Sequence, residues 1–163
     1  MLRWSWAGDA DGDEFARFTC AEVESADPWV LEVEAYVRSW VLRHAHHVLA
    51  HRDEEGTLVA VSAFDGTVVG IPLLSPLDHP GWHLQVVAIS HNHQNQRLSA
   101  EVFSGTFEAM RGLDLDRVFV TANVHGLHVV SLRACAQVGL TPWIQLDADY
   151  WILLGEVPPL PPS

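Results

Sequence analysis

Histidines form the most conspicuous groups of reactive side chains in this sequence. The ten histidines include three groups: His44-Ala45-His46-His47, His91-x-His93 and His125-x-x-His128. Zinc sites in proteins usually combine His with paired Cys thiolates, or carry two His ligands in a His-Glu-x-x-His helix. Neither pattern occurs here, so we expect no metal site and no tightly held structural zinc. A metal-binding function, with ligands that converge only in the folded chain, is the alternative.

Two further residues have the chemistry of proton transfer. His83 lies in a segment rich in β-branched residues, and an imidazole titrates near neutrality, whereas the neighbouring Gln85 cannot titrate. His83 can equally be a surface residue. Cys135 carries a thiol with an ordinary pKa of about 8.5, although a Cys on an apolar helix face is more often a small buried hydrophobic residue. A serine nucleophile is poorly supported, because no Gly-x-Ser-x-Gly elbow is present.

Charge and composition restrict the partners. The formal net charge is −12, and every permanent cation is Arg. Such a chain repels phosphate backbones and anionic lipid, which argues against nucleic acid and membrane surfaces and favours a cationic substrate such as an amine. The charge can also serve solubility alone. Only Cys20 and Cys135 are present, with neither a signal peptide nor a membrane span, so we expect a cytoplasmic protein.

The elements that position these residues are expected to form one domain over residues 1–157, followed by an extended Pro-rich tail over 158–163. Asp27-Pro28 is a helix start, Gly139 is a helix C-cap, and Asp65-Gly66 is a hairpin turn. Hydrophobic periodicity predicts helices over 14–23, 27–44, 98–112 and 127–138. It predicts strands over 2–6, 48–52, 58–64, 67–74, 82–89, 117–122, 143–146 and 150–154.

The order of these elements defines the fold class. Residues 82–122 read as strand, helix and strand, a crossover that requires parallel strands and a right-handed connection. The three preceding strands are joined by hairpin turns and are therefore antiparallel. The sequence thus predicts an α/β protein with a mixed central sheet, antiparallel in its N-terminal part, with a parallel pair flanked by helices.

This arrangement resembles the GNAT superfamily of acetyltransferases. The first family signature is an apolar strand followed by Gln/Arg-x-x-Gly-x-Gly/Ala at a helix start. Here Val86-Val87-Ala88-Ile89 precedes Gln94-Asn95-Gln96-Arg97-Leu98-Ser99-Ala100, with Arg97 and Ser99 at the two Gly positions. The second signature places a Ser or Asn, an Arg, a Tyr and Gly-Phe along the next helix. The chain has Ser131-Leu132-Arg133-Ala134-Cys135 and then Gly139-Leu140, with Cys135 at the Tyr position. The resemblance extends over about residues 82–155 and is only topological before them.

The resemblance implies a GNAT-like acyl-CoA N-acyltransferase fold with acetyl-CoA as cosubstrate. A helix N-terminus has unpaired N–H groups and a positive dipole end, which suit the pyrophosphate of coenzyme A. Arg97 can grip phosphate through its guanidinium or obstruct the loop with its Cβ, and it can also point to solvent. The cofactor-binding residues implied in this way are Val87, Ile89, Gln94, Asn95, Gln96, Arg97, Leu98, Ser99 and Arg133.

The resemblance also implies the catalytic roles. Cys135 stands where the family carries the acid that protonates the leaving thiolate, and His83 lies on the strand where the family often carries a Glu base. The predicted function is acetyl transfer to a small or peptidic amine by direct attack on the thioester. The alternative is a catalytically degenerate GNAT-fold protein that binds acyl-CoA or another ligand, or that serves as an interaction module. The sequence leaves the oligomeric state open, with a homodimer among the choices.

Overall fold

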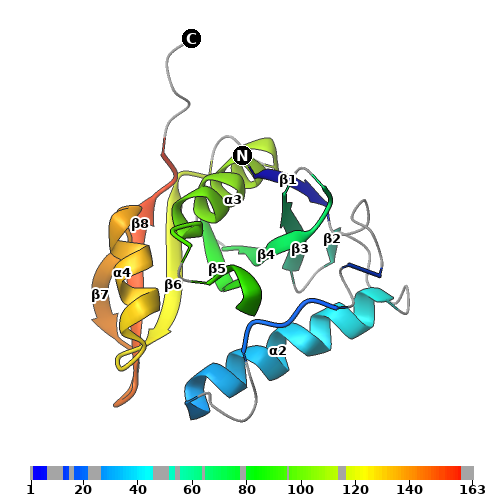
Figure 1. Ribbon diagram of the computed structural model, residues 1–163. Coiled ribbons are helices and arrows are strands. Elements are labelled where there is room, and N and C mark those ends of the chain that lie inside the picture. The colour runs from blue at the N-terminus through cyan, green and yellow to red at the C-terminus, as the bar shows by residue number, and fades with distance from the viewer. Residues whose placement is uncertain are drawn as a thin grey trace.

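The computed structural model describes residues 2–6, 13–14, 17–21, 27–45, 52–53, 56–63, 65–77, 80–94, 96–113 and 117–158. Their strands form one mixed sheet in the order β1-β3-β4-β5-β6-β8-β7, and β2 pairs with β3 (Figure 1). The strands are β1 Arg3–Trp6, β2 Arg52–Asp53, β3 Gly56–Ser62, β4 Val68–Pro76, β5 Gly81–Ile89, β6 Phe119–His125, β7 Thr141–Gln145 and β8 Tyr150–Glu156. The helices are α2 Pro28–Ala45, α3 Ser99–Leu113 and α4 Val129–Gln137, with a 3-10 turn, η2, at His91–His93.

The N-terminal half of the sheet is antiparallel, as predicted. β3, β4 and β5 are successive antiparallel neighbours, and β1 pairs with the outer edge of β3. The predicted turn at Asp65-Gly66 joins β3 to β4, and Gly66 adopts a φ of 90°, which an L-residue rarely adopts. β2 and β3 also pair antiparallel, with Asp53 opposite Gly56.

The parallel pair is the central feature of the other half. β5 and β6 run parallel, with α3 as the crossover between them, so the predicted βαβ unit is confirmed. β8 pairs antiparallel with β6, and β7 forms the far edge beside β8. This topology brings the carboxyl ends of β5 and β6 to the same end of the sheet, where α3 begins.

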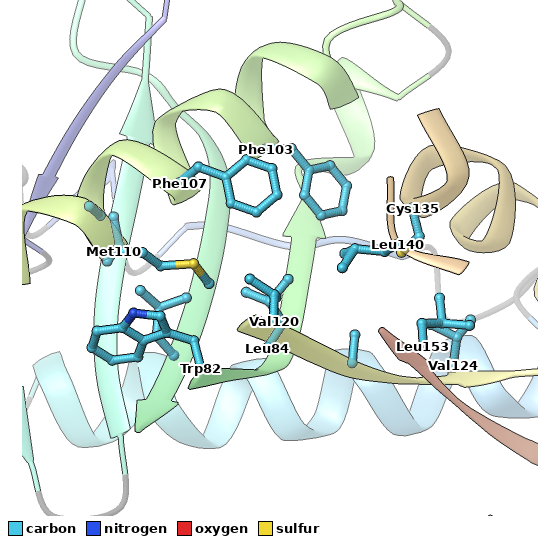
Figure 2. Close-up of a cluster of buried hydrophobic side chains, with 14 residues drawn as sticks. Trp82, Leu84, Phe103, Phe107, Met110, Val120, Val124, Cys135, Leu140 and Leu153 are labelled. Atoms are coloured by element: carbon cyan, nitrogen blue, oxygen red, sulfur yellow. The ribbon is translucent and has the colours of Figure 1, made fainter. Parts of the chain in front are cut away.

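Helices cover the sheet from two sides. On one face Val37 and Trp40 of α2 pack in a cluster with sheet residues that include Ile71 and Ala88. On the other face α3 and α4 enclose the larger cluster, to which Phe103, Phe107 and Cys135 belong (Figure 2). Alternation along β3 sends Ala60 into the first cluster and Val59 into the second, as a strand with two buried faces requires.

The predicted helix over 14–23 is wrong at its C-terminal end. Phe18 to Ala21 are described and are not helical. Phe18 and Cys20 are both buried, and side chains of α2 take up the backbone groups of this segment: the Arg38 guanidinium donates to the Phe18 carbonyl, and the Cys20 N–H donates to a Glu34 carboxylate oxygen. An irregular segment buries alternate side chains here because a helix supplies the hydrogen bonds that its own backbone lacks.

The last helix differs from its prediction in its start and in its buried face. It begins at Val129 rather than at Leu127, and Val130, expected in the core, is 71% exposed. Leu132 and Cys135 pack against the sheet instead. Leu127 belongs to the turn after β6, so the apolar run is divided between a turn and a helix. Among the described residues, no helix has the length and apolar content of a membrane span.

Candidate functional site

The site is built around the point where β5 and β6 separate. Their ladder extends from Gly81 opposite Phe119 to Leu84 opposite Ala122 and then stops. β5 continues to Ile89 along β4, and β6 continues to His125 along β8. The two facing strand edges beyond Leu84 are therefore outside the ladder that joins them. A bound chain of amides can pair with backbone groups at such edges.

A β-bulge marks the same point. Leu74 pairs with Leu84 and Leu73 pairs with Val86, so Gln85 is the extra residue on β5. A bulge increases the local twist and redirects the side chain it carries. Here the bulge lies at the first β5 residue beyond the ladder with β6, and the Gln85 amide lies against α2, where its Oε1 accepts a hydrogen bond from the Tyr36 hydroxyl.

The turn between β5 and α3 is held by side chains that the sequence had suggested for cofactor binding. Gln94 Nε2 donates to the carbonyl oxygens of Cys20, at 2.6 Å, and Ile89, at 3.0 Å. Gln96 Nε2 donates to the Asn92 carbonyl at 3.0 Å. These amides brace the turn, so its shape depends on the irregular segment around Cys20. Asn95 lies outside the described residues.

The first turn of α3 presents its amides at the end of β5. The Val102 N–H donates to the Leu98 carbonyl, the first bond of the helix ladder, and the amides before it belong to the helix N-terminus. Val87 and Ile89, both partly buried, pack toward α3 residues. Leu98 packs with them, whereas Arg133 on α4 is exposed. The structure thus brings the β5 edge and the α3 N-terminus together.

Arg97 occupies the turn in a conformation that favours glycine. Its φ is 58°, the left-handed region, where a Cβ costs about 1–2 kcal/mol. Arg97→Gly removes this strain but gives the unfolded chain more freedom, so we expect a net gain of about 0.5–1 kcal/mol. That gain corresponds to a rise in Tm of a few degrees, measured by thermal denaturation.

Arg97→Ala is the matched control for this prediction. It removes the guanidinium and keeps the strained Cβ, so its Tm should stay near that of the parent protein. An Arg97→Gly variant that melts below Arg97→Ala would contradict the assignment of strain to this residue. The same pair separates two effects on coenzyme A affinity, because both variants lose the charge and only the Gly variant loses the Cβ.

His83 lies on β5 just before the strands separate. It is partly buried, and its Nδ1 lies 3.0 Å from the Thr121 hydroxyl on β6. Burial lowers the pKa of His83 below its usual value near 6.5, and the Thr121 interaction offsets this only in part. The imidazole is therefore neutral at neutral pH, which is the protonation state of a general base.

Cys135 lies in a different environment, inside the core cluster. Its side chain is 5% exposed and faces Leu140 beneath α4 (Figure 2). Burial raises the pKa of the Cys135 thiol to about 11, so the group stays protonated. Cys20 is also a buried thiol with a raised pKa, because burial and the hydrogen bond it donates to Glu34 both disfavour the thiolate. Leu84, the neighbour of His83 on β5, belongs to the same cluster as Cys135, so His83 points to the opposite face of the sheet.

A group of polar and aromatic residues on the α2 side was missed by the sequence reasoning. Trp29 stacks on His125 with centroids 4.8 Å apart, and Tyr150 meets the same imidazole edge-on at 5.1 Å. The Tyr150 hydroxyl donates to Glu32 at 3.0 Å. One signal was available: Trp29, Glu32 and Tyr36 lie on one stripe of the helix that Asp27-Pro28 starts. We call the following set the α2-side residues: Trp29, Glu32, Tyr36, His83, Gln85, Thr121, His125 and Tyr150.

The three histidine groups do not form a metal centre in the part of the chain that is described. No group of three or more His, Cys, Asp or Glu there has the arrangement of a metal site. His125 Nδ1 accepts the Leu127 N–H, and His128 lies within hydrogen-bond distance of the Ser131 hydroxyl. The expectation of no tight zinc stays a prediction.

Known structures share this arrangement of strands and helices. A candidate acetyltransferase of the GNAT family from Desulfovibrio desulfuricans matches with a TM-score of 0.67 and 18% identity over 97% of this chain and 99% of that chain. The chain has the GNAT fold. The N-acetyltransferase PseH of Campylobacter jejuni, solved with acetyl coenzyme A, matches with a TM-score of 0.65 and 12% identity, covering 96% and 99% of the two chains. PaiA N-acetyltransferase of Thermoplasma acidophilum, solved with coenzyme A, gives 0.62 and 12% over the same shares.

Sequence comparison adds no closer relative. No protein-family model matches the sequence, and no curated protein matches it. The GNAT fold is nevertheless confirmed from the mixed sheet with its parallel pair and from these structures. Within this fold, the open edge of β5 and the N-terminus of α3 meet at one end of the sheet. The α2-side residues lie on the face of the sheet that α2 covers.

Proposed function

We propose that this protein transfers the acetyl group of acetyl-CoA to an amine. The observation that carries the proposal is the end of the β5–β6 ladder at Leu84, directly before a bulge and a strand–turn–helix unit. Amides of pantetheine fit the open strand edge at Val87 to Ile89. The proposed pyrophosphate site is the backbone of residues 94 and 96–99, because a helix N-terminus offers N–H groups and a positive dipole end.

The α2 side is the proposed approach for the amine. The net charge of −12 favours a cationic acceptor. Direct attack on the thioester requires a neutral amine, and His83 is placed to accept the proton that the nitrogen loses. Its lowered pKa keeps it ready as a base at neutral pH. The two free thiols, Cys20 and Cys135, are compatible with the reducing cytoplasm expected from the sequence.

A degenerate protein that binds acyl-CoA without turnover is the second candidate. Arg97 retains the left-handed backbone of a glycine position while it adds a side chain. Cys135 occupies the core rather than an open pocket. Both observations favour this candidate. The Arg97 side chain adds bulk to the proposed cofactor loop, and the Cys135 thiol, at the position of the family's acid, is buried away from solvent.

Binding and turnover separate the two candidates from each other and from a protein without this site. Acetyl-CoA at a hundredfold its dissociation constant should stabilise the fold by about 2.7 kcal/mol, seen as a rise in Tm. Thiol release from acetyl-CoA in the presence of a panel of amines then reports turnover. A shift in Tm without thiol release supports the degenerate candidate, and no shift at millimolar acetyl-CoA argues against both. Desulfo-coenzyme A keeps the nucleotide and the amide-containing arm but lacks the sulfur, so it is the control for the contribution of the acetyl thioester.

A further inference from the structure

The proposed transfer needs a proton for the departing thiolate, and the structure offers one from an element that the sequence did not suggest. Resting on the proposed acetyl transfer, we propose that Tyr36 of α2 is the general acid, taking the place of the α4 tyrosine that this chain lacks. Cys135 stands at that α4 position, and it lies within the core on the other face of the sheet.

The Tyr36 hydroxyl contacts the side chain of the residue at which the strands separate. Its hydroxyl donates to Oε1 of Gln85, which is both the bulge residue and the first β5 residue beyond the ladder with β6. Tyr36 is 40% exposed, and its ring meets Trp40 edge-on with centroids 6.4 Å apart. Trp40 is itself buried in the cluster between α2 and the sheet, so this contact helps to hold the Tyr36 ring in place.

The second tyrosine of the chain is less suited to this role. Tyr150 pairs with His125 of β6. His125 lies three residues after Ala122, where the β5–β6 ladder ends, so Tyr150 is farther from the point of strand separation. Its hydroxyl donates to Glu32, and burial together with the carboxylates of Glu32, Asp147 and Asp149 raises the pKa of Tyr150. A raised pKa makes a phenol a poorer proton donor. Both the position and the raised pKa of Tyr150 therefore argue against it as the acid.

His83 and Tyr36 lie on the same side of the sheet, and together they account for the protons that move in the reaction. The neutral amine nitrogen bonds to the thioester carbon, and His83 takes one proton from that nitrogen. The carbon–sulfur bond then breaks, and the electron pair leaves with the sulfur. The Tyr36 hydroxyl protonates the thiolate, which departs as coenzyme A. The tyrosinate recovers a proton from the His83 imidazolium through water, so both residues return to their starting state.

Tyr36→Phe tests this role while preserving the ring. We expect kcat to fall by roughly 10²-fold or more, with the KM for acetyl-CoA and the acetyl-CoA-dependent rise in Tm unchanged. The split between kcat and KM is the readout for a proton donor, because the loss of a binding contact alone would raise KM instead. Ser39→Ala is the matched control: it removes one hydroxyl from the same helix, at an exposed side chain that donates to the Tyr36 carbonyl, and should keep the parent kcat.

Several results would overturn the proposal. One is an active parent protein whose kcat survives Tyr36→Phe. Another is a variant with a raised KM for the amine and an unchanged kcat, which makes Tyr36 a binding residue only. A 10²-fold loss in Cys135→Ala without one in Tyr36→Phe assigns the proton to the thiol instead. If the parent protein releases no thiol with any amine, the proposed acetyl transfer is itself refuted, and the role of Tyr36 is refuted with it.

Discussion

His83→Gln is expected to lower kcat by about 10²- to 10⁴-fold, the usual contribution of a general base. Gln keeps polar atoms near the Thr121 hydroxyl, which lies 3.0 Å from His83 Nδ1, but it has no basic nitrogen. Affinity for acetyl-CoA should change little, because His83 lies before the open part of the β5 edge. Steady-state kinetics with thiol detection, together with the acetyl-CoA-dependent shift in Tm, would separate the two effects.

The pH profile gives an independent check on His83. A base must be deprotonated to act, so kcat/KM should rise with pH through the pKa of His83, which burial places below 6.5. The rising limb should therefore lie on the acidic side of 6.5 and disappear in His83→Gln. The unfolded chain binds more protons than the folded chain in this range, so stability also falls as pH drops below 6.5. Rates should be compared where Tm is still at its plateau.

Thr121→Val provides a graded variant of the same experiment. It removes the hydroxyl that orients the His83 imidazole and leaves the ring in place, so a smaller loss than that of His83→Gln is expected. Equal kcat in the parent and His83→Gln, with the acidic limb retained, would show that another group or water accepts the proton. A Thr121→Val variant more damaged than His83→Gln would point to a structural effect of the hydroxyl.

The outline of the fold was predictable because its patterns are local. The alternation in residues 82–89, the helical spacing from Leu98 to Met110 and the Asp65-Gly66 turn each indicate their own element. The order of these elements then requires a parallel pair, as found for β5 and β6. The left-handed backbone of Arg97, at the first Gly position of the motif, was not predicted from the sequence.

His83 was identified from the sequence, but the grouping of the α2-side residues around it could not be predicted, because it depends on contacts between distant segments. Which face receives Gln85 depends on a bulge, and one extra residue in a strand changes the facing of those beside it. Tyr36 and Gln85 are 49 residues apart, and Glu32 and Tyr150 are 118 apart. The helix prediction for Phe18 to Ala21 was wrong for the same reason, since Glu34 and Arg38 of α2 supply hydrogen bonds to this irregular segment.

Placement of α3 over the sheet should depend on a glycine that no motif identifies. Gly70 of β4 pairs with Ile89, the last residue of β5 before the turn that leads to α3. A Cβ at Gly70 would lie 2.7 Å from Cγ1 and 3.1 Å from Cγ2 of Val102, which is fully buried in the first turns of α3. The stiff side chain of Val102 cannot turn away without losing its own packing. A residue larger than Gly must therefore push the start of α3 outward.

Gly70→Val is accordingly expected to destabilise the fold by about 3 kcal/mol, the upper part of the usual cost of overpacking, and to lower Tm by several degrees. The displaced α3 N-terminus should also weaken acetyl-CoA binding beyond what stability alone explains, which is measurable by titration well below Tm. Gly112→Ala is the matched control, since a Cβ there meets only Trp4 ring atoms at 3.8 Å. Its Tm should stay level or rise slightly, because Ala favours a helix over Gly. An unchanged Tm and an unchanged affinity for acetyl-CoA in Gly70→Val would mean that α3 tolerates a side chain beneath it. The α3–β4 contact would then not position the turn between β5 and α3.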